Sequence, residues 1–315
     1  MFKEVKNLID KYDRVTILTH LNPDADTIGT ALGIYNLLKR DGKQVEIVNK
    51  GKNLPMYLDF LPYFSKIKNK IDFENSLIIA CDAGSIDRLG FELSGHEILN
   101  IDHHKSNTYY GTINIVEPTF VSASEVAYKV FKNHYKISKD TATCFYTALV
   151  SDTQYFSTNN VSKDVFNVAS EILGYGVNLR EVVSHLKQRR SLASIRILSS
   201  TLDTLDISND GQLVIMCASR EKMLESGSNI IDTVGIVDYA ISLVTSKIGM
   251  VLIELENSIR VSMRSKNIDI SDLAVAFGGG GHKNAVGFEI KNITAGELTL
   301  MINKEIKQRG LLNEK

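Results

Sequence analysis

Four of the seven histidines in this chain lie in short runs that are otherwise rich in aspartate and glycine, namely Thr19–Asp26, Asn100–His104 and Gly278–His282. Two further aspartates, Asp82 and Asp152, each follow an apolar stretch. Carboxylates that gather beside a core need a counter-charge, because burying them unpaired is very costly. Four or five acids with two or three imidazoles therefore predict a pair of divalent metal ions.

The first run has the spacing His20-x-x-x-Asp24-x-Asp26. On a turn at a strand end, the Asp-x-Asp pair can direct its two carboxylates into one cavity, each toward a different ion. Asp82 and Asp152 have the chemistry to bridge or flank that pair. A site of mostly oxygen ligands with a minority of nitrogens suits Mn²⁺ or Mg²⁺ better than zinc. Two such ions, roughly 3.5–4 Å apart, activate a hydroxide for in-line displacement at phosphorus.

Each of these acids also has a plainer interpretation. Asp24 or Asp26 could cap the helix that we expect to begin near Thr27. A pair of adjacent histidines is unremarkable by itself. Four such segments at the ends of four strands or helices favour the metal site instead.

The elements that must position these residues alternate between strand and helix. The sequence predicts strands at Val15–Thr19, Val45–Val48, Leu77–Cys81 and Ile98–Ile101, with a helix from about Thr27 to Arg40 after the first. This alternation predicts an α/β fold with a doubly wound parallel sheet and helices on both faces. Ligands of such sheets bind beyond the carboxyl ends of the strands, at a topological switch point.

At 315 residues the chain is longer than one core usually holds, so we expect two domains. The predicted boundaries are a catalytic, metal-binding domain at 1–186, a helical linker at 187–200 and a smaller α+β substrate-binding domain at 201–315. The active site is expected in the cleft between the domains. The C-terminal part contains strand-like runs, including Leu213–Met216 and Val286–Ile290.

Composition narrows the class of protein further. Hydrophobic residues make up 43% and charged residues 23%, as in ordinary soluble domains. The net charge of −1 argues against a general surface for duplex DNA. The amphipathic N-terminus is not a signal sequence, and no apolar run approaches the ~18 residues of a membrane span. We therefore expect a cytoplasmic protein that does not bind membranes, with its three cysteines reduced.

The glycine run near the C-terminus predicts an anion site. Four successive glycines, Gly278–Gly281, let backbone N–H groups approach a phosphate without obstruction by side chains. His282 and Lys283 follow directly, and Arg264 ends a nearby predicted strand. The guanidinium fork of arginine matches a phosphate group. A flexible surface loop would look the same, but the neighbouring charges favour substrate binding through Gly279, Gly280, Gly281, His282 and Arg264.

Taken together, these motifs resemble those of the DHH phosphoesterases. His20-x-x-x-Asp24-x-Asp26, Asp82, Asp102-His103-His104 and Asp152 match the four ordered motifs of that family. Phe277–Gly287 is similar to the glycine-rich signature of its DHH-associated C-terminal domain. The resemblance spans almost the whole chain, and its length and layout are closest to the NrnA-like branch.

The resemblance implies a role for each residue. One manganese ion would be held by His20, Asp24 and Asp82, and the second by Asp26, Asp82, His103 and Asp152. His104 would then contact the phosphate under attack, and Asp102 would orient a histidine. Which of His103 and His104 is the ligand stays open. Outside the motifs, Arg88 could reach the site or form a surface salt bridge, and Lys105 and Asn107 could contact substrate or stabilise a turn.

The NrnA-like branch implies an enzyme that hydrolyses very short RNA chains (nanoRNA, pNpN) to nucleoside 5′-monophosphates, and adenosine 3′,5′-bisphosphate (pAp) to AMP and phosphate. Two Mn²⁺ are the expected cofactors, with Mg²⁺ or another divalent ion as alternatives. The expected partners are short oligonucleotides and mono- or dinucleotides, and a homodimer is left open. We further expect the C-terminal domain to clamp the 5′-phosphate of the terminal nucleotide.

Other functions compete with this one. A phosphodiesterase acting on cyclic dinucleotides or on linear pApA and pGpG needs the same parts. A manganese pyrophosphatase would carry a lysine-rich grip in place of Gly278–His282, and a RecJ-type exonuclease would need further nucleic-acid-binding domains. A catalytically silent nucleotide sensor should have lost a metal ligand, whereas every expected one is present.

Overall fold

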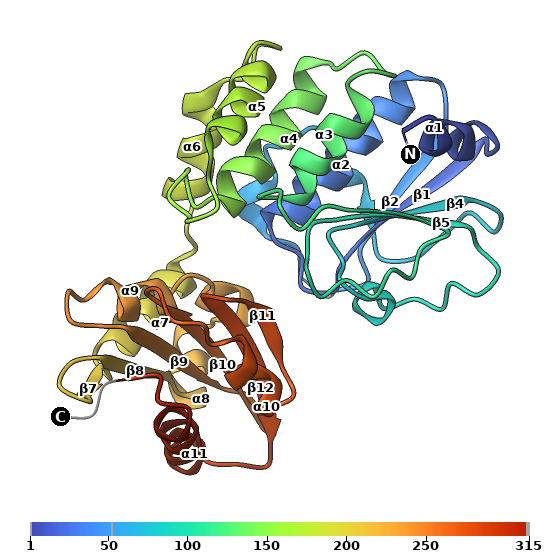
Figure 1. Cartoon of the computed structure of the whole chain (residues 1–315). Coiled ribbons are helices and arrows are strands. Elements are labelled where there is room, and N and C mark those ends of the chain that lie inside the picture. Colours follow the sequence, from blue (N-terminus) through green and yellow to red (C-terminus); the bar gives the residue numbers. More distant parts are fainter. Residues whose placement is uncertain (1, 52, 313–315) are drawn as a thin grey trace. The chain divides into compact units, whose positions relative to one another are not determined.

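The computed structural model describes residues 2–51 and 53–312, and the chain divides into two compact units, residues 1–189 and 190–315 (Figure 1). Unit 1 is built on a six-stranded sheet in the order β3-β2-β1-β4-β5-β6, with every strand parallel to its neighbours. Its strands are β1 (Arg14–Thr19), β2 (Gln44–Val48), β3 (Ile67–Lys68), β4 (Leu77–Cys81), β5 (Ile98–Asp102) and β6 (Ile113–Val116). Its helices are α1 (Phe2–Asp10), α2 (Ala25–Arg40), α3 (Ala123–Phe131), α4 (Lys139–Asp152), α5 (Lys163–Leu173) and α6 (Leu179–Gln188). The predicted parallel sheet and α/β class are confirmed.

The two faces of this sheet are covered differently. Leu77 and Ile79 of β4 face the large core that includes residues of all six helices. Ile78 and Ala80 face a smaller apolar cluster under the short 3₁₀ helix at Ile86–Leu89 and the loops around it. Strand β4 is therefore buried on both faces, which explains its continuous apolar run. In the described part of the chain, the expected helices on the second face are replaced by this 3₁₀ turn and loops.

Helices α2 and α4 pack closely because α2 presents glycine to its neighbour. A Cβ atom at Gly33 would lie 2.3 Å from Cε1 of Phe145, and one at Gly29 would lie 2.6 Å from the carbonyl oxygen of Cys144. Any larger residue would push the helices apart. The start of α2 and the end of α4 are thereby held together, and these are the helix ends that carry Asp26 and Asp152.

Unit 2 contains a second six-stranded sheet, in the order β11-β12-β10-β9-β8-β7, in which only the β8–β9 pair is parallel. One face packs on the helices α7 to α9 and the other on α10 and α11. The strands are β7 (Asp206–Ser208), β8 (Leu213–Ala218), β9 (Ile248–Glu254), β10 (Ser258–Ser265), β11 (Gly280–His282) and β12 (Ala285–Lys291). The helices are α7 (Leu192–Leu202), α8 (Arg220–Ser226), α9 (Val237–Ser242), α10 (Ser271–Ala276) and α11 (Ala295–Gln308).

Most of helix α7 lies in the segment 187–200, which the sequence suggested as a linker. Its Ile197 is fully buried in a cluster with Val214 and Met216 of β8, so α7 packs as part of unit 2. The chain between α6 and α7 is the short segment 189–191. Among the described helices, none combines the length and the apolar composition that a membrane span requires.

Candidate metal centre

Three parallel strands and two helices of unit 1 end or begin at one place. His20 follows β1, Asp82 follows β4, and Asp102 is the last residue of β5. Strands β1 and β4 are neighbours, and the chain leaves β1 toward β2 on the opposite side, so they form the topological switch point of the sheet. The sequence predicted this placement, and the structure brings the motif residues together there.

The side chains form two groups that share Asp82. In the first, Nε2 of His20 lies 3.6 Å from Oδ2 of Asp82 and 3.9 Å from Oδ1 of Asp24. In the second, Nε2 of His103 lies 3.5 Å from Oδ1 of Asp82. The same nitrogen is 3.8 Å from Asp26 and 3.6 Å from Asp152. Oδ2 of Asp82 thus faces His20, whereas Oδ1 faces His103 and also Nδ1 of His104, at 3.4 Å.

These spacings are too long for hydrogen bonds but fit ligands around a shared cation. Ligand atoms about 2.1 Å from a metal lie roughly 3 Å or more from one another. Oδ1 of Asp82 is buried and has no hydrogen-bond partner in the described part of the chain. Such an orphaned polar atom is costly unless something else satisfies it. The residues present therefore fit a pair of divalent ions.

Burial and the neighbouring carboxylates disfavour the ionised forms of the acids in this cluster. Burial raises the pKa of Asp26, and it raises the pKa of Asp82 and Asp152 well above the ordinary range. Burial likewise lowers the pKa of His20 to about 4. For His103 burial acts in the same direction, but the carboxylates of Asp152, Asp82 and Asp26 outweigh it and raise the pKa. The cluster without metal has an excess of buried negative charge.

Asp82 sits on strained backbone. Its φ of 56° lies in the left-handed region, which an aspartate adopts at a cost of order 1 kcal/mol. Its amide donates to the carbonyl of Ile101 on β5, which ties this turn to the next strand. The strain is located at the one side chain that both groups share.

The two adjacent histidines have different environments. Nδ1 of His104 lies 2.7 Å from Oδ1 of Asp102, while His103 is the histidine that faces the carboxylates of the second group. Burial would lower the pKa of His104, but the bond to Asp102 prevails and raises it to about 9. Burial would also raise the pKa of Asp102, yet its contacts with His104 and Asn107 keep it below the usual range. Nε2 of His103 thus approaches three carboxylates, whereas Nδ1 of His104 pairs with Asp102 and lies 3.4 Å from Asp82.

Helix termini position the two acids of the first motif. Oδ1 of Asp24 accepts from the amides of Asp26 and Thr27, so Asp24 is the N-cap of α2. The plainer interpretation of Asp24 is therefore true as well, because the residue is both a cap and a member of the cluster. Asp26 lies in the first turn of α2, rather than on the turn before it, and accepts from the amides of Ala123 and Ser124 at the start of α3.

Two further residues of unit 1 that the sequence singled out, Arg88 and Asn107, have different surroundings. Arg88 makes no ion pair and no side-chain hydrogen bond with any described residue, so the alternative of a surface salt bridge finds no partner there. Burial is the main cause of the low pKa of His20, and the positive charge of Arg88 lowers this pKa further. Asn107 is buried and structural, since it donates to Asp102 and accepts from Asn100 and from the amide of Tyr109.

Two residues that the sequence did not single out also support the site. Asn49, at the end of β2, donates to Oγ1 of Thr19 and to the carbonyl of His20, at 2.7 Å each. Thr27 donates to the carbonyl of Cys81, the residue before Asp82. Both side chains are buried polar groups next to a strand end, but that signal appears only once the sheet order is known.

In unit 2, Arg264 of β10 and His282 of β11 lie opposite the same residue, Ala285 of β12, so one strand separates them. Nε of Arg264 lies 3.5 Å from Oδ1 of Asp238 and is buried without a hydrogen bond to a described residue. Gly280–His282 form the short strand β11, paired with β12. The amides of Gly278 and Gly279 already donate to carbonyls of α10.

Two of the four glycines, Gly279 and Gly281, are required by close packing. A Cβ atom at Gly279 would lie 2.3 Å from the carbonyl oxygen of Gly287, and one at Gly281 would lie 2.3 Å from that of Ala285. At Gly280 the space is open. His282 is exposed at the end of β11. Gly278, Gly280, Gly281 and His282 are exposed, whereas Gly279 is half-buried.

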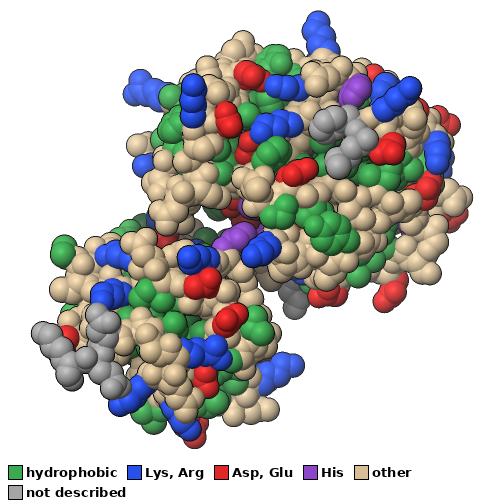
Figure 2. Space-filling model, in the orientation of Figure 1, with side chains coloured by type: hydrophobic (Ala, Val, Ile, Leu, Met, Phe, Trp, Pro, Cys, Tyr) green, Lys and Arg blue, Asp and Glu red, His purple; other side chains and the backbone are tan. Residues whose placement is uncertain are grey.

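The face of the molecule seen in Figure 2 carries charges of both signs. On the visible face of each unit, basic and acidic side chains are interspersed, with no large area of one sign (Figure 2). This agrees with the net charge of −1.

The fold and the site together define a metal-dependent class of phosphoester hydrolase, and comparison with known proteins gives its family. Residues 14–149 match the N-terminal domain of the DHH family, and residues 227–309 match the DHHA1 domain. The chain belongs to the DHH family and is a phosphoesterase, as the resemblance of its motifs predicted.

Relatives with established names cover most of the chain. A protein of Thermus thermophilus named bifunctional oligoribonuclease and PAP phosphatase NrnA is 30% identical over 89% of this chain and 85% of its own length. The protein of the same name from Bacillus subtilis is 25% identical over 92% of this chain and 93% of its own length. A cyclic-di-AMP phosphodiesterase, PdeA, of Listeria monocytogenes is 25% identical over 93% of this chain but only 47% of its own length.

Solved structures agree on the fold. An exopolyphosphatase-related protein from Bacteroides fragilis superposes with a TM-score of 0.88 at 23% identity, over 98% of this chain and 95% of that one. RecJ of Thermus thermophilus, in complex with Mn²⁺, gives a TM-score of 0.54 at 12% identity over 98% of this chain and 55% of that one.

Proposed function

We propose that this chain hydrolyses short oligoribonucleotides to nucleoside 5′-monophosphates, and 3′,5′-bisphosphonucleosides such as pAp to the 5′-monophosphate and phosphate. The observation that carries the proposal is the double cluster in which one buried carboxylate, Asp82, faces both histidines, His20 and His103. The names of the relatives from Thermus thermophilus and Bacillus subtilis support this choice of substrate.

The same cluster supports two manganese ions as the cofactors. His20, Asp24 and Asp82 would hold one ion, and Asp26, Asp82, His103 and Asp152 the other. Bound ions of this kind would act as Lewis acids and would lower the pKa of a bound water molecule, so that hydroxide is available as the nucleophile at neutral pH. The mixed set of carboxylates and imidazoles suits Mn²⁺ and also admits Mg²⁺.

The protein's own groups would bind and orient the phosphate. A protonated His104, held by Asp102, would donate to a phosphate oxygen at the site. Arg88, which makes no ion pair with a described residue, would offer its guanidinium fork to the same group. Asp102 acts through His104, so it is a positioning residue in this scheme.

Unit 2 would bind the phosphate at the other end of the substrate. Nε of Arg264 is buried beside Asp238 without a hydrogen bond to a described residue. The space at Gly280 is open, and His282 is exposed next to it. A clamp of this kind would favour very short chains and substrates with a 5′-phosphate. Arg264→Ala should raise KM about tenfold for pApA and leave KM for dephosphorylated ApA unchanged. Equal loss on both substrates would refute the clamp.

The deciding experiment is a panel of pAp, pApA, cyclic di-AMP and pyrophosphate, each with Mn²⁺ and with chelator. Turnover of pAp and pApA, lost with chelator, is the expected result. The matched control is the variant Asp82→Asn, which should lose activity on every substrate. Preferred turnover of pyrophosphate would refute the proposal.

A second function is favoured by one comparison. The named activity of the Listeria relative suggests cyclic-dinucleotide turnover as an alternative, although that protein is about twice as long as the matched part. In the panel, cleavage of cyclic di-AMP at a rate comparable with that of pApA would establish this alternative.

A further inference from the structure

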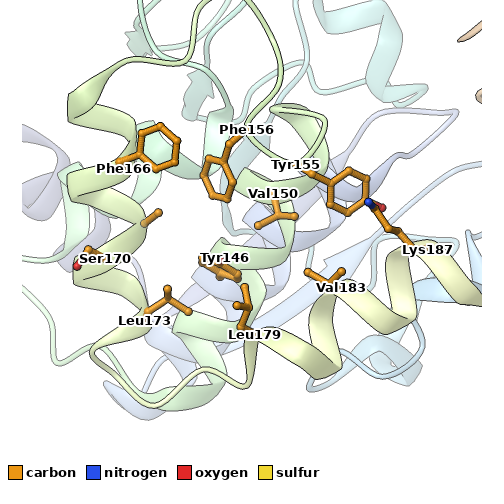
Figure 3. Close-up of a pocket in the computed structure, with 11 residues that line it drawn as sticks. Tyr146, Val150, Tyr155, Phe156, Phe166, Ser170, Leu173, Leu179, Val183 and Lys187 are labelled. Carbon is orange, nitrogen blue, oxygen red and sulfur yellow. The ribbon is translucent and has the colours of Figure 1, made fainter. Parts of the chain in front are cut away.

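An apolar pocket lies between helices α4, α5 and α6 of unit 1 (Figure 3). None of the residues that line it has a role in the proposed function. Its volume is about 500 Å³, within the range of small-molecule binding sites. Figure 3 shows side chains of all three helices and of the segment after α4 directed toward one space. The lining includes Tyr146, Tyr155, Phe156, Phe166, Leu173 and Leu179.

Large apolar side chains are left in contact with solvent at this pocket. Phe166 is 54% exposed and Leu179 is 47% exposed. The ring of Phe156 stacks on that of Phe166, with 5.2 Å between the centroids, so the exposed aromatic wall is ordered. Contiguous apolar surface of this kind usually marks a binding site, because exposing it to water is unfavourable.

One charge stands at the rim. Lys187 is the only charged side chain in the lining, and it forms no ion pair with a residue in the described part of the chain. Its Nζ lies 4.1 Å from the centroid of the Tyr155 ring, which orients the ammonium group at the edge of the apolar space. An anionic group on a ligand would be the natural partner of this ammonium group.

The lining does not suit a nucleobase. Base edges need several hydrogen-bond partners, and unsatisfied polar groups in an apolar pocket are costly. Apart from Lys187, the pocket offers only the hydroxyl groups of Ser170, Tyr146 and Tyr155. An apolar body with a single anionic head matches the lining better.

The pocket adjoins the chain that carries Asp152. Val150, in the lining, precedes Asp152 by two residues, and Tyr155 follows it by three. Gln154, Tyr155 and Phe156 all have positive φ, at 47°, 61° and 63°. Three consecutive left-handed residues are strained and hold only while their surroundings fix them. A ligand that packs on Tyr155 and Phe156 therefore acts on the backbone next to Asp152.

We propose that this pocket binds a free amphipathic monoanion, with its apolar chain among α4, α5 and α6 and its head at Lys187, and that occupation changes metal binding through Asp152. The first part depends only on the pocket. The second part rests on the proposed function, because it takes Asp152 to be a metal ligand.

Binding is tested on the full chain by calorimetry in chelator, so that no metal is involved. Decanoate should bind, whereas decanol should bind more weakly and decyltrimethylammonium more weakly still. Lys187→Ala should weaken decanoate about fivefold and leave decanol unchanged, and Lys163→Ala, which removes a lysine outside the lining, should change neither. Val183→Phe, which narrows the pocket, should weaken both by at least about tenfold.

Several outcomes would overturn the site. These are a failure of decanoate to bind, equal affinity for all three probes, or flotation of the protein with anionic vesicles without binding of monomeric decanoate. The protein could also form a dimer that the substitution Leu179→Glu dissociates, and fail to bind decanoate. That result would assign this face to a second copy of the chain.

Coupling is tested by titrating Mn²⁺ with electron paramagnetic resonance, with and without saturating decanoate. We expect at least a threefold change in Mn²⁺ affinity in the wild type and none in Val183→Phe. Decanoate binding that leaves the Mn²⁺ affinity of the wild type unchanged would refute the coupling. Because the calorimetry needs neither metal nor turnover, its failure is distinguishable from a failure of the proposed function.

Discussion

Two buried carboxylates in the same sheet of unit 1 have opposite surroundings. Glu46 of β2 and Asp82 after β4 are each 3% exposed. Glu46 accepts from Oγ1 of Thr16 and from the amides of Asp72 and Phe73, and Lys68 lies 3.3 Å away. Asp82 has an oxygen with no hydrogen bond to any described residue, strained backbone and a raised pKa.

The difference separates structure from function. A buried carboxylate whose lone pairs are satisfied by the protein stabilises the fold. A buried carboxylate that the protein leaves unsatisfied destabilises the fold until something else binds it. Burial alone therefore does not identify the site, whereas burial without partners does.

The largest expected effect is on catalysis at Asp82. Asp82→Ala should lower turnover by about 1,000-fold or more on every substrate, because both groups lose a shared ligand. Mn²⁺ binding, measured by equilibrium dialysis, should fall with it. Residual activity above one-tenth of the wild type would contradict the shared role of Asp82.

The converse change at Glu46 should affect stability and spare activity. Glu46→Gln should lower the free energy of unfolding by about 2 kcal/mol. The glutamine NH₂ group would face hydroxyl and amide groups that now donate to the carboxylate. Urea denaturation followed by circular dichroism measures the loss. Specific activity of the folded variant at low temperature should match the wild type. If metal binding is lost as well, the contrast between the two carboxylates fails.

A smaller effect on activity is expected at Asp102, which is buried but fully partnered. Asp102→Asn should lower kcat about 10- to 100-fold while Mn²⁺ affinity stays nearly unchanged, because the residue acts through His104. The wild-type pKa of His104 is about 9, raised by Asp102 against the effect of burial. The alkaline limb of the pH–rate profile should therefore move to lower pH in this variant. An unmoved limb would show that Asp102 has only a structural role.

The smallest effect is a gain in stability of the metal-free protein. Because burial raises the pKa of Asp82, the folded state holds its proton more tightly than the unfolded state does. The ionised group thus costs stability at neutral pH, and this cost disappears as pH falls through the raised pKa. Asp82→Asn should stabilise the chelator-treated protein by about 1 kcal/mol at pH 7, since asparagine also tolerates the left-handed backbone.

The gain should vanish at acidic pH and reverse with Mn²⁺, which stabilises only the wild type. Thermal melts of both proteins with chelator and with Mn²⁺ provide the measurement. A variant that is less stable than the wild type under every condition would show that Asp82 is satisfied without metal.

Much of this protein could be predicted from the order of its residues. Alternating apolar strands and helices indicated the parallel sheet, and strands such as Leu77–Cys81 predicted where the acids emerge, because burial fixes which segments are apolar. The motif residues His20, Asp82 and His103 were predicted because their chemical types and spacing are independent of their surroundings. These are local properties of the chain.

Other features depended on contacts between distant segments. The choice between His103 and His104 required Asp102 and the carboxylates to be placed around them. The loops over the second face of the sheet and the packing role of Gly279 likewise appeared only in the fold. Which lone pairs remain unsatisfied is a property of the whole tertiary structure, because a partner for a buried atom can come from any segment that folding brings near it.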